Sequence, residues 1–289
     1  MTPGYLQNIM PSDPLLPPTS DSSVLQAFLR AFQIKPEGKP LDILERVGQS
    51  FARLPYENLT KIIRQAETGS VAEARRTPDK VIADHLRLGA GGTCFSLIAT
   101  LLHLVRALGF EAQPILADRP YGLDTHCALL VWLDGRPHLI DPGFLITRPV
   151  PFVATGERKL QTAFNDILLA PQSNPERIDL ITVQKGQQSL RLTFKAQPVD
   201  RGEFLRAWDA SFSWDMMTYP LLTRVIGDRQ LYLHSNRFQV RERLKVHRCE
   251  IDPEALGERI ALEFGLSPDV VYRALEILKR KGENYGTPG

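Results

Sequence analysis

One cysteine of this chain stands where its thiol would be reactive. Cys94 follows Gly91, Gly92 and Thr93 and begins an apolar stretch with helical spacing. The nucleophilic form of cysteine is the thiolate, and a helix N-terminus beside a cationic group lowers the pKa of the thiol. The two glycines allow a tight turn and the close approach of a substrate, and free N–H groups of the first helical turn can hold an oxyanion. The pattern predicts a cysteine nucleophile, with a buried structural cysteine as the alternative.

A histidine and an aspartate of a predicted β-hairpin would complete the chemistry of this cysteine. An Asp-Gly pair at positions 134 and 135 favours a two-residue turn between the segments THCALLVWL and RPHLID. In the register that this turn sets, His126 and Asp141 are diagonal neighbours on one face, about 7–8 Å apart between backbones, and His138 lies on the other face. Asp141 would orient His126, which would take the proton of Cys94. His126 and Asp141 also have structural explanations, as a strand histidine and a turn cap, but the ordered set of three favours a catalytic triad.

Hydrophobic spacing predicts the elements that position these residues. Apolar residues recur at every third or fourth position up to Gly109, which indicates helices and a glycine stop. Short runs rich in Val, Ile, Phe and Leu then indicate antiparallel strands, among them 178–183, 190–194 and 230–234. The helical period returns from residue 252. The sequence therefore predicts an α+β fold, divided into a Pro-rich lead-in (1–20), a helical part with Cys94 (21–109), a β part with His126 and Asp141 (110–205) and a mixed α/β part (206–289).

Charge and cysteine usage exclude several classes of function. Thirty-five Lys and Arg against 33 Asp and Glu give a net charge of +2, which argues against nucleic acid or a membrane surface as a partner. No apolar run approaches the roughly 18 residues that a membrane span needs. The three cysteines have neither disulfide nor metal spacing, so we expect no metal site and a reducing, cytoplasmic location. Cys127, on the opposite strand face from His126, is interpreted as a core residue.

Two segments near the C-terminus resemble nucleotide-binding or DNA-binding features. Residues 260–278 have the outline of a helix-turn-helix, but their acidic and basic residues balance, so we interpret them as a packing or lid element. The basic run RERLKVHR, from Arg241 to Arg248, fits either contact with a nucleotide phosphate or a solvated strand edge. The strand edge is the favoured interpretation.

Three segments resemble one enzyme family. GGTCFSLIATLLHLVRALGF and DTHCALLVWLDGRPHLIDPGF are similar to the nucleophile and His/Asp segments of the arylamine N-acetyltransferases, whose pattern is Arg-Gly-Gly-x-Cys-Phe-Glu, Thr-His and an Asp closing the next strand. LPYENL resembles that family's Pro-Phe-Glu-Asn segment. The resemblance, which covers roughly residues 24–155, implies that Cys94 is acylated, that His126 is the base and that Asp141 orients it. It also implies a papain-like arrangement of a helical bundle, an antiparallel β-barrel and a C-terminal α/β lid.

The resemblance implies a ping-pong acyl transfer. Cys94 would take an acyl group from a thioester such as acetyl-CoA and pass it to an arylamine, hydrazine or related amine. Acyl-CoA is then a co-substrate, and no tightly bound cofactor is expected. Tyr56, Gly143 and Phe144 would contact the substrate, with core packing as the alternative for the two aromatic residues.

The sequence departs from the family pattern at three places. Ala90 stands where the family has Arg, Ser96 stands where it has Glu, and Gly143-Phe144-Leu145 replaces Gly-Phe-Gly. These changes keep other functions open. An amide synthase could use a larger acyl group or one bound to an acyl carrier protein, and the same residues could serve a cysteine hydrolase or amidase. A binding protein without activity is a further alternative.

Overall fold

The computed structural model describes residues 14–18, 22–153, 155–184, 186–243 and 245–282. Most of the expected Pro-rich lead-in (1–20) lies outside the described residues. Within it, Leu15 is buried in the hydrophobic core. No helix in the described part of the chain is long and apolar enough to cross a membrane.

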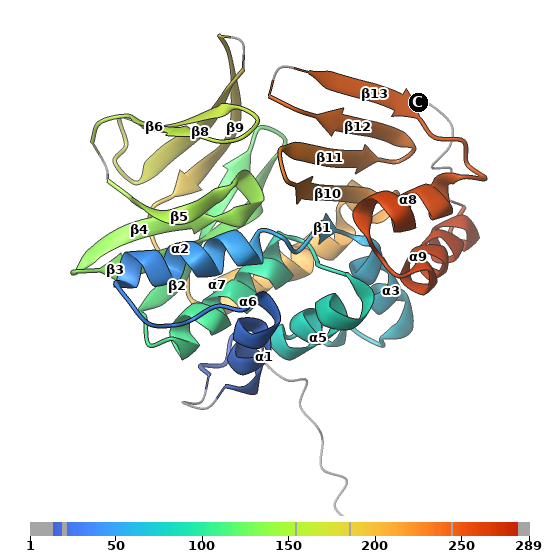
Figure 1. The fold of residues 1–289 in the computed structure, drawn as a ribbon, viewed down its shortest axis with the longest axis horizontal. Helices are drawn as coiled ribbons and strands as arrows, with labels where there is room; N and C mark the ends of the chain where they lie inside the picture. The colour runs from blue at the N-terminus through green and yellow to red at the C-terminus, as the bar shows by residue number, and fades with distance from the viewer. Residues whose placement is uncertain (1–13, 19–21, 154, 185, 244, 283–289) are drawn as a thin grey trace, which may run out of the picture.

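The N-terminal part is a bundle of helices around one apolar helix. Its members are α1 (Ser23–Phe32), α2 (Pro40–Phe51), α3 (Leu59–Glu67), α4 (Val71–Ala74), α5 (Pro78–Leu88) and α6 (Cys94–Ala107). The outer helices α1, α2 and α3 are strongly amphipathic and bury one face. Helix α6 buries most of its residues and runs through the centre of the molecule (Figure 1). It ends, as the sequence predicts, before Gly109 with φ +87°.

An eight-stranded antiparallel sheet follows the bundle. Its strands are β2 (Ala112–Arg119), β3 (Gly122–Leu133), β4 (Arg136–Asp141), β5 (Ile146–Pro151), β6 (Arg158–Gln161), β7 (Asp166–Pro171), β8 (Arg177–Gln184) and β9 (Gln187–Lys195). Their order is β5-β4-β3-β2-β9-β8-β7-β6, and no pairing among the described strands joins β5 to β6. The expected barrel is therefore a curled half-barrel.

Both faces of this sheet are buried where it meets α6. On β3, Leu129 and Val131 join the core around α6, whereas Ala128 and Leu130 join the second core inside the half-barrel. Alternate residues of one strand thus serve two cores. Two buried faces explain why β3 reads as a continuous apolar run rather than an alternating one.

The C-terminal part is a five-stranded sheet backed by two helices. The sheet order is β1-β10-β11-β12-β13, where β1 (Tyr56–Glu57) comes from the N-terminal part. The other strands are β10 (Leu221–Ile226), β11 (Arg229–His234), β12 (Arg237–Arg241) and β13 (Val246–Glu250). Helix α7 (Arg201–Ala210) precedes them, and α8 (Leu256–Phe264) and α9 (Pro268–Arg280) lie against them (Figure 1).

The helix-turn-helix outline is a packing element. Ile260, Phe264, Val271, Ala274 and Leu278 of α8 and α9 are buried in the same core as α6. The two helices therefore pack against the core, as the sequence analysis expects. The α+β fold that the sequence predicts is confirmed.

Candidate active site

Cys94 is the first residue of α6, as the sequence predicts. Thr93 is the N-cap residue with extended backbone angles, and the Cys94 side chain is buried. The first N–H groups of a helix have no partner within the helix, so they point toward the space in front of the thiol. This position gives Cys94 the positive end of the helix dipole.

The packing of the turn requires the glycines before Cys94, and their expected role in the approach of a substrate stays a prediction. A Cβ atom at Gly91 would lie 1.7 Å from the carbonyl oxygen of Pro55, and one at Gly92 would lie 2.3 Å from the hydroxyl oxygen of Ser96. The Gly92 N–H donates to the Pro55 carbonyl at 3.2 Å. The turn is therefore fixed against the segment that leads into β1.

His126 and Asp141 meet in the register that the Asp-Gly turn sets. The pairs from Leu129–Ile140 to Leu133–Arg136 follow that register, and both turn residues have positive φ. His126 Nε2 lies 2.7 Å from Asp141 Oδ2, and both side chains are buried. His138 lies on the other face, where its Nδ1 meets a backbone carbonyl.

The buried imidazole is held in its charged form. Burial favours the neutral ring, but the charge and hydrogen bond of Asp141, together with the hydrogen bond to the Cys94 sulfur, raise the pKa of His126 to about 9. Because Nε2 is engaged by Asp141, Nδ1 is the nitrogen that faces Cys94. The imidazolium is therefore the form expected at neutral pH.

The Cys94 thiol has a pKa well below its usual range. The largest cause is a hydrogen bond from the Cys127 thiol; burial opposes it, and His126 and the Arg119 charge add to it. Cys127 is buried in the hydrophobic core, as the sequence analysis expects, and it also adjoins the Cys94 thiol. Burial raises the pKa of Cys127, so it stays a thiol and can donate to the Cys94 thiolate. In the sequence, the only indication of this role is that Cys127 directly follows His126.

Two further cations surround the nucleophile, and the sequence analysis missed both. Arg119 Nη2 lies 3.3 Å from His126 Nδ1, and Nη1 donates to the Tyr121 hydroxyl at 2.6 Å. Lys61 Nζ donates to the Ser211 carbonyl at 2.8 Å. Burial lowers the pKa of Lys61 to about 7, against the effect of the Cys94 charge. No carboxylate of the described residues lies within salt-bridge distance of Arg119, so its charge acts on the thiolate.

Arg76 supports the turn that carries Cys94. Its guanidinium is buried and donates to the Gly91 carbonyl at 2.5 Å and to the Thr60 hydroxyl at 2.9 Å. Its Nη1 lies 3.7 Å from the carboxylate of Glu57. Burial raises the pKa of Glu57, and the Arg76 charge opposes this effect. A residue 14 positions before Ala90 thus supports the turn that carries the nucleophile. No local motif in the sequence indicates this role of Arg76.

Ser96, which stands where the family has glutamate, makes a local contact within the turn. Its hydroxyl donates to the Thr93 carbonyl at 3.0 Å and fills the space beside Gly92. The hydroxyl of Ser96 therefore caps the turn locally, whereas Arg76 supplies the charge.

The three residues predicted to contact the substrate surround the triad. The Phe144 ring lies 5.4 Å from the His126 ring at 88°. Gly143 packs so that a Cβ would lie 3.1 Å from Asp141 Oδ1. Tyr56, on β1, is half-buried; burial and then the Cys94 charge raise its pKa. Their contact with a substrate stays a prediction.

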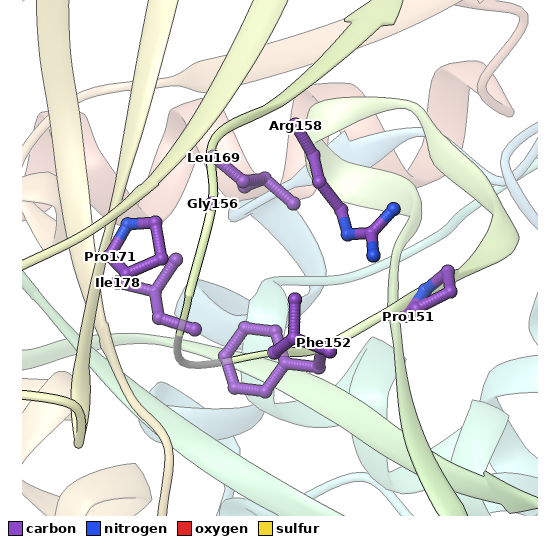
Figure 2. A pocket seen from close by; sticks show the side chains of 8 residues that line it. Pro151, Phe152, Gly156, Arg158, Leu169, Pro171 and Ile178 are labelled. Carbon is purple, nitrogen blue, oxygen red and sulfur yellow. The ribbon is translucent and has the colours of Figure 1, made fainter.

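A cavity of about 10 Å³ lies elsewhere in the half-barrel. Figure 2 shows its lining, which includes Pro151, Phe152, Arg158, Leu169 and Ile178. It contains no nucleophile or base. Within the described part of the chain, no group of three or more His, Cys, Asp or Glu side chains is arranged to hold a metal ion.

Comparisons with known proteins point to one family. The N-acetyltransferase family model matches residues 40–270. None of the curated proteins compared with the chain matches it significantly.

Several solved structures share the fold. An arylamine N-acetyltransferase from Mycobacterium abscessus is 19% identical, with 88% of this chain and 94% of that chain covered and a TM-score of 0.75. The Mycobacterium marinum enzyme, solved in complex with CoA, is 17% identical, with 89% and 98% covered and a TM-score of 0.72. A Bacillus cereus enzyme described as having a unique Cys-His-Glu catalytic triad is 17% identical, with 86% and 100% covered and a TM-score of 0.69. At these identities the likeness establishes the fold.

Proposed function

We propose, from the premise that this chain belongs to the N-acetyltransferase family, that it transfers an acetyl group from acetyl-CoA to an arylamine through a thioester on Cys94. The similar structures are arylamine N-acetyltransferases, and one of them was solved with CoA. These relatives support the classes of acceptor and donor. The residues that carry the reaction are proposed from the geometry of this chain.

The first half of the reaction forms the acetyl-enzyme. The Cys94 thiolate attacks the thioester carbonyl, and N–H groups of the first turn of α6 hold the oxyanion. As the tetrahedral intermediate collapses, the bond to the sulfur of CoA breaks, and His126 gives its proton to the leaving thiolate. CoA leaves as the thiol, and His126 becomes neutral.

The second half transfers the acetyl group. The amine attacks the thioester of Cys94, and His126 takes the proton that the nitrogen loses. The bond to Cys94 breaks, and the sulfur leaves as the thiolate that Cys127, His126 and Arg119 stabilise. The product is the amide, and the thiolate–imidazolium pair is restored.

The observation that carries this proposal is the contact of His126 Nε2 with Asp141 Oδ2 at 2.7 Å, beside a buried cysteine at a helix N-terminus. The third residue is an aspartate here, whereas the Bacillus cereus relative is described as using glutamate. Either carboxylate can hold the imidazolium, because both accept the N–H of the ring.

Steady-state kinetics with acetyl-CoA and an arylamine test the proposal. We expect parallel double-reciprocal lines, which are the signature of a ping-pong reaction, and loss of the rate in Cys94→Ala. Cys249→Ala is the matched control, because Cys249 is exposed and lies outside the site. Release of free acetate without amide product would instead favour the hydrolase, and a full rate in Cys94→Ala would refute the thioester.

An acyl carrier protein as donor is a second proposal, supported by Leu145. This residue has φ +62°, a left-handed conformation that glycine favours, at the position where the family has glycine. The loop keeps a glycine-like backbone and adds a side chain beside Phe144. Rates with carrier-bound acyl groups and with acetyl-CoA decide between the two donors.

The cytoplasmic location stays a prediction.

A further inference from the structure

A polar cavity of about 180 Å³ lies between the half-barrel and the C-terminal sheet. On the half-barrel side it is lined by Thr182, Ser189 and Arg191, and on the other side by Arg241. One water needs roughly 10–15 Å³ of cavity volume, so this cavity can hold a phosphate group with several waters. It lies apart from the small cavity of Figure 2, and the two share no lining residue.

The cavity concentrates positive charge without a counter-ion. Its lining residues include two arginines and no acidic side chain. No carboxylate of the described residues lies within salt-bridge distance of Arg191 or Arg241. Burial, and then the charges of Arg191 and Arg248, lower the pKa of Arg241. Guanidinium groups that repel one another in a partly buried space are stabilised when an anion enters.

Arg241 also has an unused donor. Its Nε is buried and has no hydrogen-bond partner among the described residues. Arg191 is held in place, since its Nε donates to the Thr182 hydroxyl at 2.7 Å. A buried N–H of a charged group that stays unpaired costs free energy, and an acceptor oxygen in the cavity would remove that cost. The hydroxyl and amide groups of the lining residues supply further hydrogen-bond donors for an anion in the cavity.

The cavity lies on the side of the C-terminal sheet that faces the active site. Strand β11 pairs with β12 so that Tyr232 lies opposite Gln239, and Arg241 is two residues further along. Tyr232 and Arg241 therefore share a face as diagonal neighbours, about 7–8 Å apart between backbones. Tyr232 in turn lies near Tyr121 and Arg119, whose groups perturb its pKa. Arg241 thus lies on the sheet face that carries Tyr232, the residue that links this face to Arg119 beside His126.

We infer that Arg191 and Arg241 bind the phosphate groups of the acyl donor, a phosphorylated pantetheine thioester. The inference rests on the proposed function for the choice of the donor as ligand. A pantetheine arm separates the thioester from the phosphates, so a phosphate site is expected at a distance from Cys94 and on the side of the sheet that faces it. An arylamine carries no phosphate, which excludes the acceptor. The basic run at Arg241 is then both an edge segment and a phosphate contact.

Equilibrium binding tests the site without any chemistry at Cys94. Calorimetric titrations use CoA, 4′-phosphopantetheine and pantetheine on the wild type, Arg241→Gln, Arg191→Gln and the control Arg229→Gln. Arg229 is an exposed arginine on β11 outside the lining. We expect about a tenfold weaker affinity for CoA in Arg241→Gln and in Arg191→Gln, and no change in the control. Pantetheine, which lacks phosphate, should bind all four proteins equally.

The three titrated ligands distinguish the phosphate groups of the donor and define the results that would overturn the inference. Loss of affinity for 4′-phosphopantetheine places the phosphate next to the pantetheine in the site, and loss for CoA alone places the nucleotide phosphates there. Equal CoA affinity in all four proteins, or an equal loss for pantetheine, overturns the inference. If saturating inorganic phosphate leaves the affinity for CoA unchanged, the inference is overturned as well. Failure of acetyl-CoA to acylate Cys94 would refute the proposed function and leave this binding result standing, and thermal melting of each variant verifies folding.

Discussion

At the scale of single residues, the reactivity of Cys94 depends on a donor that is itself a cysteine. The Cys127 thiol is the largest cause of the lowered pKa of Cys94, ahead of His126. A thiol is a weak donor, but here it is buried next to a charge, where hydrogen bonds are stronger than in water. A serine could donate equally, whereas alanine could not.

Cys127→Ala should raise the pKa of Cys94, and Cys127→Ser should keep it low. The reason is that only the serine hydroxyl replaces the lost hydrogen bond to the thiolate. The measurement is the rate of alkylation by iodoacetamide against pH, in which the midpoint reports the thiolate. The exposed Cys249 gives the background rate, which Cys249→Ala removes. A midpoint in Cys127→Ala equal to that of the wild type would contradict the role of Cys127.

Arg76→Met should destabilise the protein and reduce its activity together. The substitution leaves the buried Glu57 carboxylate without its cationic neighbour and the Gly91 carbonyl without its donor, at a cost of about 3–5 kcal/mol. Urea unfolding measures this loss. The control is Arg87→Met, whose exposed ion pair with Asp84 should contribute about 0–1 kcal/mol. Equal stability of Arg76→Met and Arg87→Met would show that Arg76 does not support the turn.

At the scale of elements, the site depends on two turns with different requirements. Gly91 needs the absence of a Cβ because the Pro55 carbonyl occupies that space. Gly135 has open space around it and needs only its φ of +71°. One turn is limited by packing, and the other by backbone conformation.

Gly91→Ala should disrupt the nucleophile turn, and Gly135→Ala should cost only about 1 kcal/mol. In the first variant backbone atoms must move, whereas the second adds the cost of a left-handed alanine. Thermal melting and the acetylation rate are measured for both. Because the hairpin register is also set by its apolar pairs, Gly135→Ala should keep its activity. Full activity of Gly91→Ala would contradict the packing explanation.

The parts of the site that follow from local sequence were predictable. The start of α6 and the hairpin register depend on neighbouring residues and on the period of two of a strand, so Cys94, His126 and Asp141 could be brought together by reasoning. Arg76, Arg119 and Lys61 approach through tertiary contacts that no spacing encodes. The packing requirement at Gly91 could not be predicted for the same reason, since its partner Pro55 lies 36 positions earlier.

At the scale of the whole molecule, the thiolate–imidazolium pair leaves a signature in the pH dependence of stability. The folded protein keeps a proton on His126 up to about pH 9, whereas an unfolded histidine loses it near 6.5. This term stabilises the fold below pH 6.5 and is lost as the pH rises through 9. The lowered pKa of Cys94 has the opposite sign, because the unfolded thiol holds its proton up to about 9. Between pH 7 and 9 the two terms cancel in the wild type.

Cys94→Ala should therefore lose stability between pH 7 and 9 relative to the wild type. Removal of the thiol leaves the His126 term, which Asp141 still supports, with a slope of up to about 1.4 kcal/mol per pH unit. Chemical unfolding at several pH values measures the difference between the two proteins. A constant difference across this range would mean that Cys94 and His126 do not exchange a proton in the folded state.

The intact mass of the protein after brief mixing with acetyl-CoA, without an amine, tests the central claim most directly. The account predicts one acetyl group per wild-type chain, located on the peptide that contains Cys94, absent in Cys94→Ala and discharged when an arylamine is added. An unmodified wild-type chain, or the same adduct on Cys94→Ala, would contradict it.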